Sequence, residues 1–591
     1  MDLARYRSAE ELERQLAPHA AEGGPFCPAR MVAQDDGDAF PQQALDVLGG
    51  LGTQNYFIPE SLGGKLSSYE ECLALLRVIS RRDLTAAIAF GKTYLGAVHV
   101  WVGGNAEQRT ELAEIVARNE PVCFALTERA HGSDVTASEV SAEKVPGGWK
   151  LRGEKWLINN GTRSTVVTLF ARTDPRGGAR GSSLFMVRKS ALAPGTYRHH
   201  PKVRTLGIRG ADISGVVFEG AFVPDAALIG MEGGGLDIAL KGLQLTRTLC
   251  AGFSLGAADT AMRLALDFAM SRVLYGKTAL EIENVRGTFV DAFVDLLLAD
   301  AAAIAAHRTI QVAPEQLSAL SAIVKYFVPT TSESLVRDLS VVLGARHFLR
   351  EEHHAGVFQK TMRDNSVVSL FDGSTIVNLG LLGAQLLQIQ KTRRRLGATA
   401  SAERDARIAR IFDLEVDLPR FEPERLKLMN FGVEHGVQSL DRAVARFAEE
   451  RGEMGLLPDV QEAIFDCAQK LVMERDALEI AVDDTAARGG FAAGAHEAFE
   501  ISRRYCALYA ASAALQLWIH SRHAMPSWLA RGHWLALALR RTLTRFRPEL
   551  ALGPRPFVST VLEDLVSLVR KGNMISLVPF RLAPPWNGIS S

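Results

Sequence analysis

Hydrophobic positions change their spacing along the chain, and these changes divide it into four zones. From Met1 to about Glu120, apolar residues recur at helical intervals, as in the run YEECLALLRVISRRD, which predicts amphipathic helices. From Pro121 to about Gly230, short β-prone runs such as TVVTLFART are separated by clusters of glycine, proline, aspartate and asparagine, a pattern typical of strands joined by turns. Helical patterns rich in alanine and leucine return at Leu236, and a further helix-rich zone follows the basic run KTRRR.

This order predicts a mostly α-helical α+β fold with four domains. They are an N-terminal helical domain at 1–120, a middle β domain at 121–232, a C-terminal helical domain at 233–390 and an additional helical domain at 391–591. Because strands and helices do not alternate, a Rossmann sheet is disfavoured. The glycine run Glu232–Asp237 lacks both the G-x-G-x-x-G spacing and a βαβ context, so it predicts a hinge between sheet and helix.

The composition is that of an ordinary globular protein, with 47% hydrophobic and 23% charged residues. Lysine plus arginine equals aspartate plus glutamate at 67 each, so no overall charge favours nucleic acid or an anionic membrane. The six cysteines include no C-x-x-C pair, which gives no support to zinc chemistry and is typical of reduced cytosolic thiols. The N-terminus lacks the apolar core of a signal peptide, and no uncharged apolar run reaches a spanning length. We therefore expect a cytoplasmic protein without a nucleic-acid partner.

The segment CFALTERAHGSDV at Cys123–Val135 carries the strongest chemical signal. A β-prone run leads into hydroxyl side chains, Thr127 and Ser133, with small residues between them. Such a loop can bring hydroxyls and backbone N–H groups close to a polar ring edge or a pyrophosphate. Taken alone, threonine, serine and glycine in a loop usually indicate only a turn.

Five segments, in order, resemble those of the acyl-CoA dehydrogenase family. They are IPESLGG at Ile58–Gly64, CFALTERAHGSDV against LTEPGAGSD, EKWLINN at Glu154–Asn160 against K-x-WITN, RVLYGK at Arg272–Lys277 against R-x-x-FG-K, and MRDNSVVSLFDGST at Met362–Thr375 against a segment ending in YEGT. The resemblance extends to about Gln390, two-thirds of the chain. It implies FAD as cofactor, a barrel-like middle β domain and a four-helix bundle as the C-terminal domain.

The resemblance also implies which residues hold FAD. Thr127 is expected to contact the flavin ring, Ser133 the pyrophosphate, and Trp156 the flat face of the isoalloxazine. Arg272 and Tyr275 match positions that reach the FAD of a neighbouring subunit, where the planar fork of an arginine suits a pyrophosphate. The complete set of predicted cofactor-binding residues is Thr127, Ser133, Trp156, Ile158, Arg272, Tyr275, Gly344 and Thr375.

The predicted catalytic residues are Asp372 and Arg247. SLFDGST aligns with YEGT without gaps, so Asp372 falls where the family has the glutamate that removes the α-proton of an acyl thioester. An aspartate is one methylene shorter, and a misplacement of about 1 Å can cost on the order of 100-fold in rate. Arg247 matches a family arginine near the active site, although a surface position on a helix is the simple alternative. The second family location for a base holds Thr246 here.

Three functions stay open at this point. The first is α,β-dehydrogenation of an acyl thioester of coenzyme A or of an acyl carrier protein, with β-hydride transfer to flavin N5 and an electron-transfer flavoprotein or another acceptor as partner. The second is oxidation of another carbon acid, because nitroalkane oxidase, a superfamily member, has an aspartate at this position. The third is a catalytically weak paralogue that binds flavin or ligand. Ile158, Arg129 and the run Val341–Ala345 depart from family residues near the flavin and indicate a specialised member.

Two remaining features concern metal and partners. His353 and His354 are adjacent and lack the i, i+4 spacing of a helical zinc site, so we predict a solvated turn and no metal. The zone after Gln390 resembles the extension of the very-long-chain branch of the family, which implies a homodimer. Within it, Ser527–Phe546 combines helical apolar spacing with arginines, and this pattern predicts either contact with a membrane surface or packing against neighbouring helices.

Overall fold

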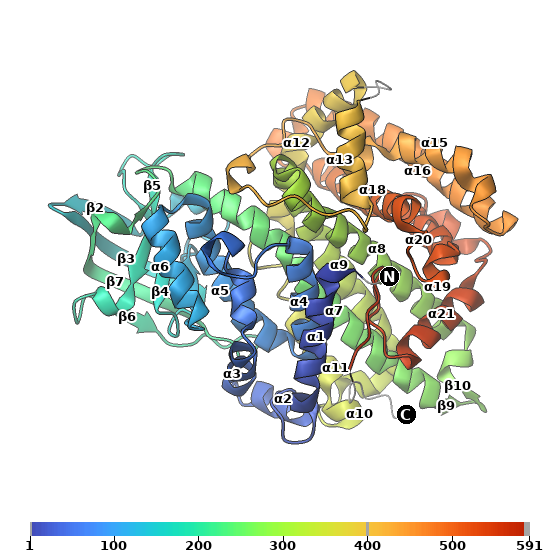
Figure 1. Ribbon diagram of the computed structural model, residues 1–591, viewed down its shortest axis with the longest axis horizontal. Helices are drawn as coiled ribbons and strands as arrows, with labels where there is room; N and C mark the ends of the chain where they lie inside the picture. The colour runs from blue at the N-terminus through green and yellow to red at the C-terminus, as the bar shows by residue number, and fades with distance from the viewer. Residues whose placement is uncertain (1–2, 397–400, 584–591) are drawn as a thin grey trace.

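The computed structural model describes residues 3–396 and 401–583. Its β sheet lies at one end of the molecule, the N-terminal helices and the long bundle helices occupy the middle, and the helices that follow α12 cover the far side (Figure 1). Helices predominate in every part except the segment between residues 122 and 229, which holds eight strands. The predicted fold class, mostly α with a central sheet and extra C-terminal helices, is confirmed.

Six α-helices precede the sheet: α1 (Ala4–Leu16), α2 (Pro28–Asp36), α3 (Gln42–Gly50), α4 (Tyr69–Arg82), α5 (Leu84–Gly103) and α6 (Ala106–Ala117). The side chain of Ser68 accepts a hydrogen bond from Glu71 N at the start of α4, and Asp83 separates α4 from α5 by accepting from Thr85 N. Both are typical N-caps, which satisfy backbone donors that the first helical turn leaves free. Most side chains of α5 are buried, so this helix runs through the interior.

Eight strands form one sheet: β1 (Val122–Ala125), β2 (Ser141–Val145), β3 (Gly148–Asn159), β4 (Val166–Arg172), β5 (Ser182–Arg188), β6 (Tyr197–His200), β7 (Ile213–Pro224) and β8 (Leu228–Ile229). Their order is β6-β7-β3-β2-β4-β5-β8, with β1 parallel to β4. The pairing of β3 with β7 is interrupted between Trp156 and Ile158, where Leu157 has φ 57°. This bulge turns the two flanking side chains in different directions. Part of the sheet encloses a hydrophobic core of its own, while other strand residues, such as Phe170 and Leu184, belong to the core of the helices.

The C-terminal bundle consists of α7 (Gly235–Ser271), α8 (Glu283–Val312), α9 (Leu317–Leu343) and α12 (Thr375–Leu396). A short hairpin, β9 (Val273–Leu274) with β10 (Lys277–Thr278), follows α7. Between α9 and α12 lie the short helices α10 (Glu352–Ala355) and α11 (Val357–Asn365). Helices α4 and α5 pack against α7, which brings the N-terminal helices to the segment just before α12.

The extension adds nine helices among the described residues: α13 (Ala402–Phe412), α14 (His435–Gln438), α15 (Leu440–Glu450), α16 (Pro458–Ala487), α17 (Gly490–Ala493), α18 (His496–Ser521), α19 (Ser527–Ala530), α20 (His533–Leu543) and α21 (Val558–Arg570). Helices α18, α20 and α21 pack on α8, and α18 also packs on α12. They share one continuous hydrophobic core with the bundle.

The stretch Ser527–Phe546 packs against the protein, the second of its two predicted arrangements. Trp534, Leu535 and Leu539 of α20 are fully buried, and Arg541 pairs with the buried Asp295 of α8 at 3.0 Å. Helix α20 therefore has no apolar face left for a lipid surface, which corrects the alternative of membrane contact through this stretch. In the described part of the chain, every helix is too short or too polar to cross a bilayer.

Candidate active site

Asp372 lies in a sharp turn immediately before α12. Its φ is 55° and that of Gly373 is 105°, a left-handed conformation that aspartate and glycine tolerate better than most residues. Arg247 of α7 donates from Nε to the backbone oxygen of Asp372 at 2.7 Å. Lys325 of α9 donates to the backbone oxygens of Val368 at 2.6 Å and Gly373 at 3.2 Å. Two bundle helices thus hold the turn through its carbonyl groups.

The carboxylate of Asp372 is held by a different cation. Lys92 of α5 donates to Oδ2 at 2.8 Å, and the two side chains are 3% and 7% exposed. The Lys92 ammonium also lies 3.6 Å from the ring centroid of Phe371, and the Cys250 thiol donates to the same carboxylate oxygen at 3.7 Å. The family motif pointed to Asp372 and Arg247, but it gave no indication of Lys92, Lys325 or Cys250.

Burial and neighbouring charges shift the pKa of Asp372, Lys325 and Cys250. Burial alone would raise the pKa of the Asp372 carboxyl, but Lys92, and after it Lys325 and Arg247, lower that pKa below its ordinary value. Burial lowers the pKa of Lys325 to about 8, and burial with the adjacent Asp372 raises the pKa of the Cys250 thiol to about 12. Asp372 is therefore a carboxylate, and Cys250 a neutral thiol, at neutral pH.

A narrow cavity opens beside this carboxylate. Its wall is mainly apolar and includes Phe57, Leu76, Tyr94, Leu249 and Phe253, with Thr246, Cys250 and Lys92 adding polar atoms. It encloses about 20 Å³, which is space for about one water molecule. Thr246, the residue at the family's second base location, thus reaches the same cavity, but it carries no ionisable group.

Two of the predicted cofactor residues meet at the edge of the sheet. The backbone N–H of Trp156 donates to the backbone oxygen of Thr127 at 2.9 Å, and the Trp156 ring is half-buried. Arg129 lies over this ring, 4.4 Å from its centroid. Ile158, beyond the bulge, is only 2% exposed and packs in the core of the sheet, so its side chain does not share the surface of Trp156.

A buried ion pair fixes the loop that carries Thr127. Lys155 donates to Glu128 Oε1 and to the backbone oxygen of Leu126, both at 2.8 Å. Glu128 also accepts from the backbone N–H of Glu139 at 2.8 Å. Burial alone would raise the pKa of Glu128, but Lys155 and these hydrogen bonds lower it to about 2. Lys155 was not singled out from the sequence, although it lies inside the EKWLINN match. Ser133 is exposed in the same loop.

The remaining predicted cofactor residues belong to the bundle. Thr375 begins α12, three positions after Asp372. Arg272 follows α7, about 37 Å along the helix from Arg247 at about 1.5 Å per residue, and the next hairpin leaves Tyr275 99% exposed. Gly344, with φ 56°, lies between Val341 and Phe348, which are 75% and 82% exposed. Within one chain, the structure does not bring Arg272 or Tyr275 to Asp372.

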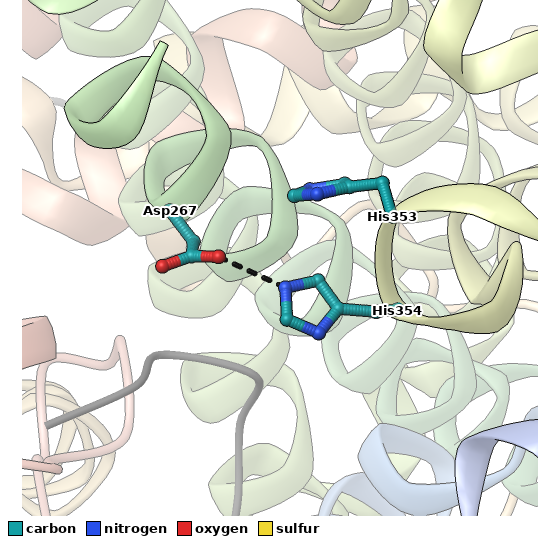
Figure 2. Close-up of side chains that lie close together, drawn as sticks. All are labelled: Asp267, His353 and His354. Atoms are coloured by element: carbon teal, nitrogen blue, oxygen red, sulfur yellow. Dashed lines mark hydrogen bonds and ion pairs between the residues drawn. The ribbon is translucent and has the colours of Figure 1, made fainter.

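Two histidines and an aspartate form the one group of described residues that could hold a metal ion (Figure 2). One ligand atom from each of Asp267, His353 and His354 lies within 4.8 Å of the others. His354 bonds Asp267 Oδ2 at 2.9 Å, and His353 Nε2 lies 2.9 Å from the backbone oxygen of Leu264. The pair is half-buried against α7, not in a solvated turn as the sequence indicated. These hydrogen bonds explain the arrangement as a contact between α10 and α7.

Comparisons with known proteins agree with this geometry. The family descriptions "Acyl-CoA dehydrogenase, middle domain" and "Acyl-CoA dehydrogenase, C-terminal domain" match residues 123–221 and 233–387. These two segments have the middle and C-terminal domains of the acyl-CoA dehydrogenase family. The probable acyl-CoA dehydrogenase FadE25 of Mycobacterium tuberculosis is 26% identical over 377 residues, which are 64% of this chain and 92% of that protein.

Solved structures of acyl-CoA dehydrogenases show the same fold. Butyryl-CoA dehydrogenase from Megasphaera elsdenii covers 66% of this chain and 100% of its own, with a TM-score of 0.59 and 22% identity. An acyl-CoA dehydrogenase complexed with FAD from Bacillus anthracis covers 99% of this chain and 93% of its own, with a TM-score of 0.68 and 15% identity. Its coverage includes the extension, so the fold of the whole chain, extension included, has a counterpart in a solved structure.

The matched domains and relatives support an FAD-dependent oxidoreductase of the acyl-CoA dehydrogenase type, which acts on acyl thioesters in general. The residues present suit that cofactor. Trp156 offers a half-buried aromatic face, Arg129 adds a cation beside it, and the buried Glu128–Lys155 pair fixes the loop between them. The predicted cofactor, enzyme class and family are confirmed.

Proposed function

We propose that Asp372 removes the α-proton of an acyl thioester that binds beside the cavity between α5 and α7. One observation carries this proposal: Asp372 is the buried carboxylate on the cavity wall, and its backbone is fixed by Arg247 and Lys325. A fixed turn limits the positions that the short aspartate side chain can take, and geometry decides first whether a group can act as a base. Bound FAD supplies the acceptor for the β-hydride.

Lys92 sets the strength of the proposed base. A carboxylate that accepts a hydrogen bond from a buried ammonium holds a proton weakly, because the ammonium stabilises the charged form. Asp372 therefore suits a carbon acid whose proton is already acidified, as it is in a thioester. The backbone N–H of this turn can also support the developing charge on the thioester oxygen, as donors do in oxyanion-type sites.

Thr127, Trp156 and Arg129 are proposed to hold the flavin ring, with Ser133 toward the pyrophosphate. Arg272 and Tyr275 are proposed to reach the FAD of a second copy, because they lie far from the Asp372 of their own chain. Exposed apolar side chains near these bundle positions, such as Val341 and Phe348, support a homodimer that covers them. Coenzyme A or an acyl carrier protein as thioester carrier, and an electron-transfer flavoprotein or another acceptor, complete the proposal.

The test uses the FAD-loaded enzyme under anaerobic conditions with a panel of acyl thioesters. We expect bleaching of the flavin and an enoyl thioester product with the wild type. We expect Asp372→Asn to keep its bound FAD and to lose at least about 100-fold in the rate of flavin reduction, because general-base catalysis typically contributes 10²–10⁴-fold.

Three outcomes would contradict this function. Unchanged turnover of Asp372→Asn would remove Asp372 as the base. Peroxide release from another carbon acid, with no enoyl product from any thioester, would select the oxidase alternative. A stable holoenzyme that reduces its flavin with neither substrate class would select the weak, ligand-binding alternative.

A further inference from the structure

The site around Asp372 contains more buried positive than negative charge. Lys92, Lys325 and Arg247 come from three different helices and are 3%, 0% and 6% exposed. Asp372 is the carboxylate that acts on both Lys325 and Arg247 and that pairs with Lys92. The next carboxyl, Glu333, is half-buried. Burial raises its pKa, and the Ser369 hydroxyl bonds it.

Backbone oxygens do not remove this imbalance. Lys325 and Arg247 donate to carbonyl groups of the turn, which are dipoles and carry no net charge. Buried charges are stable in proteins when an opposite charge accompanies them. The positive charge of the three cations therefore exceeds the negative charge of Asp372 and favours the binding of a second anion.

Lys92 is the cation that can accept this second anion. An ammonium has three donors, and among the described residues Asp372 Oδ2 is the one hydrogen-bond acceptor within reach of Lys92 Nζ. Lys92 also lines the cavity, whereas Lys325 is committed to two backbone oxygens. A ligand in the cavity therefore meets the Lys92 ammonium directly.

We propose that the acyl chain of the substrate carries a free carboxylate. This carboxylate binds the Lys92 ammonium, which then no longer pairs with Asp372. This inference rests on the proposed function and adds a substrate class to it. Asp372, released from its partner, becomes a stronger base when the correct substrate arrives. Arg247 and Lys325 keep the turn in place during the exchange, because they hold backbone atoms.

The position of Lys92 also limits the length of this chain. Its Nζ lies 2.8 Å from the oxygen that must reach the α-carbon, so an anion bound to Lys92 is only a few bonds from that carbon. A thioester of a short dicarboxylic acid, such as glutaryl-CoA, meets this condition.

The experiment compares glutaryl-CoA with the thioester of its monomethyl ester, which has nearly the same shape but no negative charge. Binding is measured in the FAD-loaded Asp372→Asn enzyme by the change in the flavin spectrum, and flavin reduction is measured in the wild type. We expect tighter binding of glutaryl-CoA by on the order of 30-fold or more, as for buried charge pairs elsewhere. In wild-type enzyme, glutaryl-CoA should also reduce the flavin faster.

Variants test whether Lys92 causes the preference for glutaryl-CoA over the uncharged thioester. Lys92→Met should bind both thioesters equally, and Lys92→Arg should restore a preference for the charged one. Lys241→Met, which removes an α7 lysine paired with Asp237, should leave the preference unchanged. Circular dichroism of each variant separates loss of binding from loss of fold.

Equal or better binding of the uncharged thioester by the Asp372→Asn enzyme would overturn this inference while leaving the proposed function intact. A preference for glutaryl-CoA that survives in Lys92→Met would also overturn it. Failure of the proposed function gives a different result, because then neither thioester reduces the flavin.

Discussion

At the scale of single residues, the backbone and the carboxylate of Asp372 are held by different side chains. Its backbone is fixed by Arg247 and Lys325, and its carboxylate is held by Lys92. Because different cations perform these tasks, the carboxylate can change partner while the turn stays in position. The left-handed turn at Asp372 and Gly373 is therefore as important for the site as the carboxylate itself.

Gly373→Ala tests this turn. At φ 105° an alanine is strained, and its Cβ would lie 3.1 Å from Arg247 Nε. We expect a loss of about 1–3 kcal/mol in the free energy of unfolding and a slower flavin reduction with FAD still bound. Gly380→Ala is the control, because it lies in α12 with nothing within 4 Å and should gain up to about 1 kcal/mol. Equal unfolding midpoints in urea for the two variants would contradict a strained turn at Gly373.

The sequence predicted part of this residue-scale picture. Asp372 and Arg247 could be found because each lies within a short motif that resembles the family. Lys92 could not, because it is 280 positions from Asp372 and meets it only after α5 packs beside the bundle. The one signal in the sequence is a single lysine inside the apolar run AAIAFGKTYLG, which by itself does not name a partner.

At the scale of elements, a side chain of β3 holds the loop between β1 and β2 in place. Lys155 of β3 and the Glu128 carboxylate that it binds are buried, while Thr127 and Trp156, the residues beside them in sequence, reach the surface. Alternating side chains of a strand point to opposite faces, so the ion pair supports the surface on which the flavin is proposed to lie. The half-buried residues of the family motif thus depend on the buried ion pair beside them.

Glu128→Gln should weaken FAD binding by disordering this loop. The substitution leaves the buried Lys155 ammonium without its anion, and breaking a buried pair in this way typically costs about 3–5 kcal/mol of stability. Titration of the apoenzyme with FAD, followed by flavin fluorescence, measures the effect. Glu139→Gln is the control, because its side chain is 74% exposed and only its backbone N–H contacts Glu128. Unchanged FAD affinity in Glu128→Gln would show that the Glu128–Lys155 ion pair does not support FAD binding.

Helix α20 shows why an element can be predicted while its surroundings cannot. The apolar spacing of Ser527–Phe546 gave the helix, but the same pattern fits a membrane surface and a protein core. Asp295 decides between them, because this buried acid on α8 pairs with Arg541 and Arg545. Asp295 lies more than 200 positions earlier in the sequence, so no local pattern could reveal the pairing.

At the scale of the whole molecule, the segment around Ser576 and Leu577, after α21, contacts both the N-terminal helices and the bundle. Asp300 of α8 binds Arg77 of α4 at 2.5 Å and accepts from the Ser576 hydroxyl and Leu577 N–H at 2.7 and 2.8 Å. Leu577 is fully buried. The division into four domains at 120, 232 and 390, expected from changes in texture, stays a prediction, and one hydrophobic core includes residues of all four segments.

Leu577→Ala measures how much this segment contributes. A fully buried leucine replaced by alanine typically costs about 2–5 kcal/mol, and here the loss should appear as one cooperative transition if the segment and the bundle unfold together. Leu552→Ala is the control, since this leucine is 92% exposed and should change stability by less than about 0.5 kcal/mol. A separate early transition confined to Leu577→Ala would show that the extension unfolds on its own.

Acid should destabilise the molecule through its buried histidines. Burial lowers the pKa of four histidines to about 4. Two are fully buried in α5 and α8, and two lie in the extension, where the second is half-buried: His99, His307, His435 and His520. In the unfolded chain their pKa is about 6.5, so between about pH 6.5 and 4 the unfolded state binds protons that the folded state does not. Stability therefore falls as the pH falls through this window, and the decline levels off below about pH 4.

Unfolding in urea at pH 7.5, 6.0 and 5.0 measures this slope. A group with a pKa of about 4 in the fold and about 6.5 when unfolded contributes up to about 3 kcal/mol between these limits. His307→Gln removes one such group from α8 and should reduce the slope by that share. His523→Gln is the matched control, because this histidine is 61% exposed and pairs with Glu415 at the surface. The same slope in the wild type and in His307→Gln would show that buried histidines do not set the acid limit of the fold.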